Sequence, residues 1–394
     1  MESYDVAVIG AGLAGLQCAR TLARRGLRVA LADKKQTPWS TVHTTGIFVR
    51  RTLEDFALPL VCLGPPIRDV IVYSPSRKPL ALRSRYDEFR VGDMRGLYER
   101  MLDECLRLGV TWMPRMRYCG IDAEGARSSV RLQKFRADAR NATFILKARY
   151  VVGADGAMSA VARDLGLDSN REWIVGLEEV FDGVPVAVPP TLHCFLDPVL
   201  APGYLAWVVH DGVQAHIGVG GDARRFDPQA ALAAFHRTIT GLVDLAHARL
   251  VERRGGRIPV GGVLARIANR RGLLVGDAAG APSPLTAGGL DACLRLSEHA
   301  ANAIAFRMQA DDDQPLQDYD GARFRARFFA RRWMRKALSA LRDPLALDIA
   351  CAALRAWPLR PLAEHIFFGR GSFPEITGRR ARGPEAYGLS SRGY

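Results

Sequence analysis

The feature that most constrains the fold is a glycine-rich turn between two short apolar runs at the beginning of the chain. Residues 4–9 (YDVAVI) are followed by GAGLAG at 10–15, and residues 27–32 (LRVALA) end at Asp33. In such a turn the glycines permit a tight bend, let the backbone approach a pyrophosphate, and let the next helix pack against the sheet. The N-terminus of that helix offers free N–H groups to phosphates. The spacing predicts a βαβ unit that binds a dinucleotide, with Asp33 placed to accept hydrogen bonds from ribose hydroxyls.

Two later segments join a strand-like apolar run to a turn that contains Gly and Asp. Residues 151–163 read VVGADGAMSAVAR, and residues 273–290 read LLVGDAAGAPSPLTAGGL. In the second segment the carboxylate of Asp277 can bind a polyol hydroxyl, and the small residues allow close backbone approach. The helix beyond 288–289 can stabilise negative charge at its N-terminus. Taken alone, the first segment is an ordinary turn into a helix, and the second is a Gly/Pro-rich loop with one solvated Asp.

In this order and spacing, the three motifs resemble the flavoprotein superfamily of the p-hydroxybenzoate hydroxylase type over about residues 4–308. The resemblance implies FAD, with Asp33 on the adenosine ribose, Asp277 on the ribitol and the Asp-Gly pair at 155–156 near the pyrophosphate. Arg95, in the run VGDMR before a predicted helix, matches a family arginine that reaches toward the cofactor. The residues expected to bind the cofactor are Gly10, Gly12, Leu13, Ala14, Gly15, Asp33, Lys34, Arg95, Asp155, Gly156, Gly276, Asp277, Pro284, Gly288, Gly289 and Leu290.

The Gly-Asp motif also separates the branches of this superfamily. Aromatic hydroxylases of the group usually read GDAAH, whereas this chain has Gly280 at the fifth position. The run at 276–290 is more similar to the geranylgeranyl reductase family, whose members hydrogenate isoprenoid double bonds with reduced FAD. Tyr204 and Trp207 lie in a segment similar to that family's YxWxFP segment, with two valines in place of its Phe and Pro. They are therefore the expected substrate-pocket residues, with a core strand packed through its aromatics as the alternative.

The loop near residue 45 supplies the catalytic candidates. Many geranylgeranyl reductases have a cysteine there, in a CGxG-like loop that faces the substrate. This chain reads VHTTGI at 42–47, without a cysteine. His43 and Thr45 are the candidates to donate a proton or to position a substrate. The alternative for His43 is an ordinary surface histidine.

Positive charge is concentrated near the C-terminus. The chain carries a formal net charge of +14, and residues 319–342 alone hold eight Arg or Lys and five aromatic residues. On one continuous helix, one face would carry Phe324, Phe328, Trp333 and Ala337, and an adjacent face would carry Arg323, Arg327, Arg331 and Arg335. Two interpretations follow: aromatics packed on the flavin domain with arginines in solvent, which we favour, or an interfacial helix on anionic lipid. Nucleic-acid binding is not expected, because no recognition module is present.

The expected fold class is α/β, with a Rossmann-like FAD domain, an inserted substrate domain rich in antiparallel strands, and C-terminal helices. Helices are predicted at about 93–108, 228–250 and 289–308, an antiparallel meander at 117–152, and an irregular segment at 36–59. The expected boundaries are 1–67, 91–170 and 264–310 for the FAD domain, 68–90 and 171–263 for the substrate domain, 311–378 for the helical region, with an acidic linker at 311–313, and 379–394 for a flexible tail.

These observations predict an FAD-dependent oxidoreductase that reduces carbon–carbon double bonds of a hydrophobic, isoprenoid-like substrate. The alternatives are an FAD monooxygenase and, from another class, a non-catalytic redox-sensing flavoprotein. One dinucleotide motif is visible, so electrons are expected from NADPH, NADH or another external donor. The seven scattered cysteines predict no metal site. Without a signal peptide or an apolar span, a cytoplasmic protein is expected, with contact to the inner face of the membrane as the role of the basic helix if it binds lipid.

Overall fold

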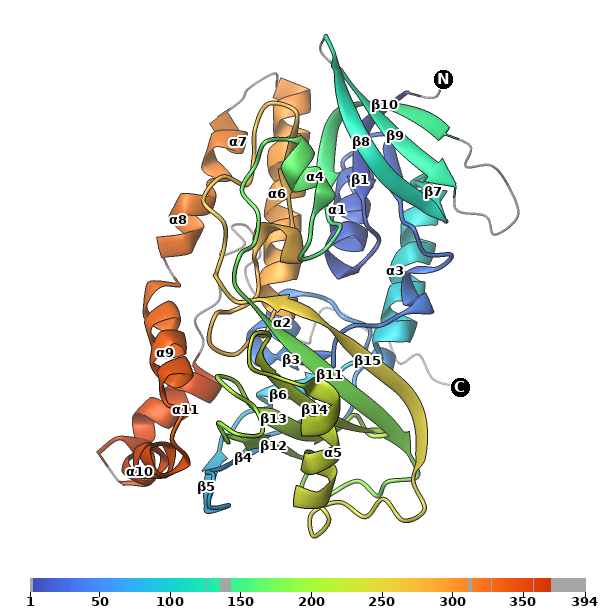
Figure 1. Cartoon of the computed structure of the whole chain (residues 1–394). Coiled ribbons are helices and arrows are strands. Elements are labelled where there is room, and N and C mark those ends of the chain that lie inside the picture. Colours follow the sequence, from blue (N-terminus) through green and yellow to red (C-terminus); the bar gives the residue numbers. More distant parts are fainter. Residues whose placement is uncertain are drawn as a thin grey trace, which may run out of the picture.

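The computed structural model describes residues 3–125, 127–134, 143–310, 314–326, 328–356 and 358–369. The acidic linker at 311–313, the predicted tail at 379–394 and Arg327 lie outside the described residues. Two β-sheets lie one beyond the other along the long dimension of the molecule, and the C-terminal helices follow one side from the first sheet to the second (Figure 1).

The first sheet contains the dinucleotide unit predicted from the sequence. Its strand order is β7-β2-β1-β10-β9-β8, with β16 also paired to β10. Strands β7, β2, β1, β10 and β16 are parallel, and β8–β10 form the predicted antiparallel meander. The short parallel strands are buried on both sides, because helices cover both faces of such a sheet. The strands are β1 Ser3–Ile9, β2 Val29–Ala32, β7 Thr111–Met113, β8 Met116–Glu124, β9 Arg127–Lys134, β10 Thr143–Gly153 and β16 Gly272–Leu274. The helices are α1 Leu13–Arg24, α3 Met94–Arg107, α4 Ala160–Asp164 and α6 Leu290–Ala310.

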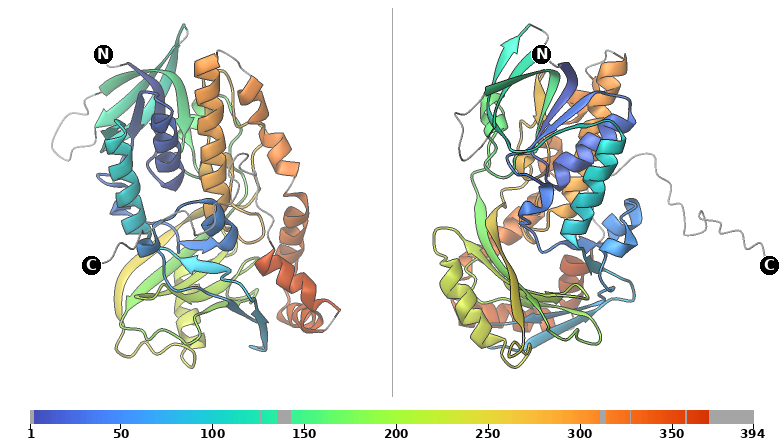
Figure 2. Two further views of the ribbon diagram at one scale, coloured as in Figure 1. Left: turned by 180° about the vertical axis from the view of Figure 1, so that it is seen from behind. Right: turned by 90° about the vertical axis from the view of Figure 1, so that its right-hand side faces the viewer.

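The second sheet is antiparallel except where β12 pairs with β4. Its order is β15-β11-β14-β13-β12-β4-β5, so that β4 and β5 join strands that follow them by about a hundred residues. Helix α5, Pro228–Thr238, packs on one face through Leu232 and Phe235, and the C-terminal helices pack against the other face (Figure 2). The strands are β4 Asp69–Tyr73, β5 Pro79–Arg83, β11 Trp173–Asp182, β12 Thr191–Phe195, β13 Ala206–His210, β14 Ala215–Asp222 and β15 Arg249–Pro259.

Two of the predicted segments are wrong in detail. The helix expected over 228–250 ends at Thr238, and the chain enters β15 at Arg249. Residues 239–248 lie between the helix and the strand. The pairing of β15 with β11, which has a register shift between Val180 and Phe181, overrides the expected helical pattern at 249–250. The segment at 36–59, expected to be irregular, contains β3, Ile47–Val49, which pairs with β6, Phe89–Val91, and the short helix α2, Arg50–Asp55.

The basic C-terminal segment is divided among several helices. These are α7 Gln314–Asp318, α8 Gly321–Ala326, α9 Phe329–Ala340, α10 Pro344–Arg355 and α11 Arg360–Phe368. The chain turns at Phe328, between α8 and α9, so residues counted across the break no longer share one face. Phe324 and Phe328 are buried as expected, but Trp333 is 58% exposed and Arg335 is buried. The expected division into a packed aromatic face and a solvated arginine face is therefore wrong within α9.

Candidate active site

A cavity of about 1100 Å³ lies between the two sheets and the C-terminal helices. From the first sheet it is lined by Gly156, Asp277 and Gly289, which belong to the second and third motifs. From the second sheet it is lined by Glu178 and Trp207. Much of the remaining wall is apolar, and α9, α10 and α11 supply a large part of it. One space thus joins the expected cofactor loops to a long apolar compartment.

The glycine turn after β1 has the shape that a pyrophosphate requires. Gly10 has a φ of 104°, and a Cβ there would lie 2.2 Å from the carbonyl oxygen of Ala154. A Cβ at Gly15 would lie 1.8 Å from the carbonyl oxygen of Gly10, so α1 packs directly on the turn. A Cβ at Gly12, by contrast, would meet no atom within 4 Å. Space is therefore open at the N-terminus of α1, where a cofactor phosphate would bind.

Asp33 lies buried at the end of β2, next to this turn. Its Oδ2 accepts a hydrogen bond of 2.7 Å from the backbone N–H of Ala11, and its Oδ1 accepts one of 2.8 Å from that of Lys35. These contacts fix the carboxylate beside the turn and leave lone pairs for ribose hydroxyls. Lys34 is exposed at the same strand end.

Asp277 is the half-buried acid of the third motif. Burial raises the pKa of its carboxyl to about 6. Its backbone carbonyl accepts a hydrogen bond of 2.8 Å from Asn170, but within the described part of the chain no recorded hydrogen bond reaches its side chain. A carboxyl that lines the cavity without a protein donor fits a ligand that carries hydroxyl groups, as the ribitol of FAD does. Gly276 has a φ of 59°, and a Cβ there would come within 2.7 Å of Ala14 in α1.

Five of the other expected cofactor residues lie next to the cavity or to the glycine turn. Gly288, Gly289 and Leu290 line the cavity at the start of α6, while Pro284 is buried in the loop before it. Leu13 lies buried in the first turn of α1.

Two expected residues have other contacts. Asp155 accepts hydrogen bonds from the hydroxyl of Ser159 (2.5 Å) and the backbone N–H of Ala160 (2.8 Å), so its carboxylate stabilises the start of α4. Arg95 is exposed in the first turn of α3 and is not among the described residues that line the cavity.

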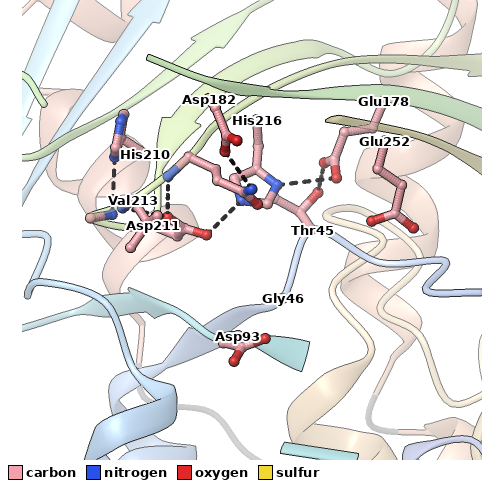
Figure 3. A network of polar contacts seen from close by, with 12 residues as sticks. Thr45, Gly46, Asp93, Glu178, Asp182, His210, Asp211, Val213, His216 and Glu252 are labelled. Carbon is pink, nitrogen blue, oxygen red and sulfur yellow. Dashed lines mark hydrogen bonds and ion pairs between the residues drawn. The ribbon is translucent and has the colours of Figure 1, made fainter. Parts of the chain in front are cut away.

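One expected catalytic residue, Thr45, and one expected substrate-pocket residue, Trp207, come together around Glu178 in β11. Its Oε2 accepts hydrogen bonds from the hydroxyl of Thr45 and from Nε1 of Trp207 (3.1 Å). Its Oε1 lies 3.3 Å from Nδ1 of His216, whose Nε2 lies 3.1 Å from Oδ2 of Asp211 (Figure 3). The structure thus adds three polar residues that the sequence analysis did not identify, and it joins them to Thr45 and Trp207.

Charge is balanced inside this network. Burial opposes a charge on His216, but its hydrogen bonds to Asp211 and Glu178 outweigh burial and raise its pKa to about 9. Burial likewise opposes the ionisation of Glu178, yet its contacts with His216, Thr45 and Arg254 lower its pKa below the usual value. A protonated imidazole therefore lies between two ionised carboxylates at neutral pH.

His43 and Tyr204 lie at the margin of the same cavity. His43 is exposed, and its Nδ1 lies 3.1 Å from the carbonyl oxygen of Gly255. The hydroxyl of Tyr204 donates a hydrogen bond of 2.6 Å to the carbonyl oxygen of Thr286. Both line the cavity, as does Trp207.

Comparisons with known proteins agree with this arrangement. Residues 5–89 match the family of FAD dependent oxidoreductases. Digeranylgeranylglycerophospholipid reductase 1 of Methanococcoides burtonii is 28% identical over 339 residues, which cover 81% of this chain and 79% of the relative. A geranylgeranyl bacteriochlorophyll reductase-like protein from Thermoplasma acidophilum has the same fold, with a TM-score of 0.81 and 22% identity over 94% of this chain and 98% of that chain. The p-nitrophenol 4-monooxygenase of Pseudomonas putida is more distant, with a TM-score of 0.69 and 18% identity over 95% of both chains.

The fold and the comparisons together indicate an FAD-dependent oxidoreductase, with a fold similar to that of flavoproteins of the p-hydroxybenzoate hydroxylase type. Within that class the chain is a relative of the geranylgeranyl reductases, which confirms the prediction made from its Gly-Asp motif. Among the described residues, no helix is both long and apolar enough to cross a membrane.

Proposed function

We propose that the protein reduces carbon–carbon double bonds in the isoprenoid chains of a lipid. The observation that carries this proposal is a cavity in which the expected cofactor loops meet an apolar compartment walled in large part by α9, α10 and α11. The size and the mostly apolar wall suit a long hydrocarbon chain better than a small polar ring. The sequence relationship to digeranylgeranylglycerophospholipid reductases supports the same substrate class.

A charged group near the cofactor loops supports a lipid with an anionic headgroup. Arg331 of α9 lines the cavity, and its Nη1 donates a hydrogen bond of 3.3 Å to the hydroxyl of Ser283 in the loop before α6. Burial lowers the pKa of its guanidinium, although Asp291 opposes that shift. A phosphate bound beside Arg331 would give this half-buried cation a charged partner.

The other residues of the site have two proposed roles, cofactor binding and proton transfer. Gly12 and Asp33 would hold the pyrophosphate and the adenosine ribose, and Asp277 would bind the ribitol. When bound and reduced, FAD supplies the hydride for the alkene. The apolar wall excludes water from the reacting carbons, while Thr45 and His43 are the residues from the loop at 42–47 that can donate or position a proton. Electrons reach the cofactor from NADPH, NADH or another external donor.

We further propose that the C-terminal helices rest on a membrane surface. The faces of α9 and α10 that turn away from the cavity carry Phe329, Trp333, Leu345 and Ile349, which are between 58% and 66% exposed. Lys336 lies beside Trp333, with its ammonium 5.3 Å from the ring centroid. Helices that are apolar both toward the cavity and toward the outside suit a position between a hydrocarbon-binding pocket and a bilayer. A lipid substrate could then enter the cavity from the membrane.

An anaerobic assay tests the reaction. Chemically reduced protein is mixed with a geranylgeranylated glycerophospholipid in detergent micelles, and the products are analysed by mass spectrometry. Each saturated double bond adds two hydrogens, a gain of about 2 Da, and the flavin spectrum returns to its oxidised form. Product that appears only with oxygen and carries label from 18O2 would replace this proposal with a monooxygenase.

A further inference from the structure

A chain of hydrogen bonds connects the cavity with a surface turn through the second sheet. It begins at Thr45 and Glu178, which line the cavity, and continues through His216 of β14. It ends at Asp211, in the turn between β13 and β14, where Gly212 and Val213 are exposed. We call these four residues the relay: Thr45, Glu178, His216 and Asp211 (Figure 3).

The turn holds Asp211 in place at the outer end of the relay. Its Oδ1 accepts hydrogen bonds from the backbone N–H groups of Val213 (2.7 Å) and Gln214 (2.6 Å), so that Oδ2 remains directed to His216. The carboxylate is partly accessible, because 14% of the side chain is exposed. A proton from solvent can therefore enter at this end of the relay.

The inner end is surrounded by groups that keep Glu178 ionised between turnovers. Arg254 of β15 places its Nη1 3.5 Å from Oε1 of Glu178, and its own charge is shared with Glu252. Nε1 of Trp207 and the hydroxyl of Thr45 both donate hydrogen bonds to Oε2 of Glu178. In the described part of the chain, the charged side chains recorded beside the inner end of the relay are Arg254 and, through Arg254, Glu252 of β15. At the outer end, His210 and Asp182 lie close by, hydrogen-bonded to Gly212 and Gln214 of the turn that holds Asp211.

We propose that the relay delivers the proton that double-bond reduction consumes, an inference that rests on the function proposed above. The reaction adds a hydride, with its electron pair, to one alkene carbon and a proton to the other. The π bond is replaced by two C–H bonds, and the flavin is oxidised. The proton passes from Nδ1 of His216 to Glu178, and from there through the hydroxyl of Thr45 to the substrate carbon.

This step leaves His216 neutral, with its remaining ring hydrogen on Nε2. Rotation of the ring then turns its unprotonated nitrogen toward Asp211, where it accepts a proton that entered from solvent. The imidazolium is again hydrogen-bonded to both carboxylates, and Glu178 is ionised once more. Glu178 and Thr45, which line the cavity, act on the substrate. His216 and Asp211 act through Glu178, and their role is to store and pass on the proton.

The neighbouring residue in β11 provides a matched control. Glu179 is also buried and is paired with a histidine and an arginine, His236 (2.7 Å) and Arg253 (2.9 Å). Its carboxylate lies on the opposite face of the sheet, toward α5, and does not line the cavity in the described part of the chain. Replacing either glutamate removes one buried ion-pair network, but only Glu178→Gln interrupts the relay.

The test combines a substrate-free measurement with single-turnover kinetics on the FAD-loaded protein. In histidine-labelled protein, NMR should show that His216 remains protonated at pH 8 and titrates near pH 9. Asp211→Asn should move that titration to lower pH. With reduced protein and a geranylgeranylated phospholipid, flavin reoxidation in the wild type should slow as the pH rises through 9.

Glu178→Gln should slow this reoxidation about 100-fold, without that pH dependence and with unchanged FAD content. Glu179→Gln should remain within about 3-fold of the wild type and retain its pH profile. If Glu178→Gln does not fold, the pair Thr45→Val and Thr45→Ser decides: the valine variant should be slow, and the serine variant should recover the rate and the profile.

The possible failures are distinguishable. A wild type that reduces the lipid while Glu178→Gln keeps its rate and pH profile would overturn the relay alone. Equal losses in Glu178→Gln and Glu179→Gln would also overturn it, because both would then reflect damage to the sheet. A wild type that binds FAD but reduces no isoprenoid would overturn the proposed function and the relay with it.

Discussion

The hydroxyl of Tyr204 donates a hydrogen bond of 2.6 Å to the carbonyl oxygen of Thr286, and this contact joins the second sheet to the loop before α6. That loop leads into Gly288 and Gly289, which line the cavity where the cofactor is expected. The guanidinium of Arg335 lies 5.8 Å from the centre of the Tyr204 ring. Tyr204 therefore holds the loop at 283–289, where the cofactor is expected, in addition to lining the cavity.

Tyr204→Phe should separate these two roles. Loss of the hydroxyl removes one hydrogen bond and should lower the free energy of unfolding by about 1 kcal/mol. It should also weaken FAD binding, because the loop at 283–289 loses its attachment to the second sheet. Urea denaturation and fluorescence titration of the apoprotein with FAD measure both effects. Unchanged FAD affinity would leave Tyr204 as a wall residue only.

The glycine turn offers a sharper test of the cofactor site. A Cβ at position 12 would meet no protein atom within 4 Å, so Gly12→Val should fold normally but purify without FAD. At position 15 a side chain would collide with the backbone of Gly10, so Gly15→Val should lose stability as well as cofactor. Circular dichroism, thermal melting and the flavin absorbance per polypeptide distinguish the two outcomes. A yellow Gly12→Val protein would contradict the expected pyrophosphate position.

The buried imidazole predicts a specific dependence of stability on pH. The pKa of His216 is raised from 6.5 to about 9, so its protonated form stabilises the fold. This contribution, about 3 kcal/mol, is fully present below the unfolded pKa and is lost as the pH rises through about 9. The free energy of unfolding should therefore differ most between the wild type and His216→Gln near pH 6, and the difference should narrow toward pH 10. Urea denaturation at several pH values measures this, and a constant difference would contradict the assigned charge.

The outward faces of α9 and α10 predict binding to anionic membranes. The double variant Trp333→Glu with Ile349→Glu places two charges on this apolar face and should abolish sedimentation with phosphatidylglycerol liposomes. Because both side chains are more than half exposed, the variant should keep its fold and its FAD. Leu106→Glu on α3, also at an exposed leucine but away from the C-terminal helices, is the control and should bind like the wild type. Wild-type protein that does not sediment with these liposomes at low salt would contradict the proposed contact.

The sequence was sufficient for the parts of the site that depend on local pattern. The turn at 10–15, Asp33 and the Gly-Asp loop each lie within one strand–turn–helix segment, so their spacing predicts their geometry. The contact between Glu178 and His216 depends instead on how β11 pairs with β14, where Val180 is the residue opposite His216. No local pattern specifies this register, and two consecutive acids in an apolar strand were the only available signal. The inward position of Arg335 was missed because the break at Phe328 changes the phase of the helix.

The depth of the apolar compartment leads to a prediction about substrate length. Ala350 of α10 lines the cavity, so Ala350→Phe would fill part of the space available to a hydrocarbon chain. The variant should bind FAD normally and still reduce short prenyl chains, but it should reduce a geranylgeranyl chain at least 10-fold more slowly, since a chain that cannot enter fully cannot reach the cofactor loops. Ala352→Phe places the same ring on the exposed face of the same helix and should behave like the wild type toward both substrates. Rates of flavin reoxidation with farnesyl and geranylgeranyl lipids, measured anaerobically, give the ratio for each protein. An unchanged ratio in Ala350→Phe would mean that the hydrocarbon chain does not pass along α10, and a ratio lowered equally by Ala352→Phe would indicate disturbance of the helix instead of a filled cavity.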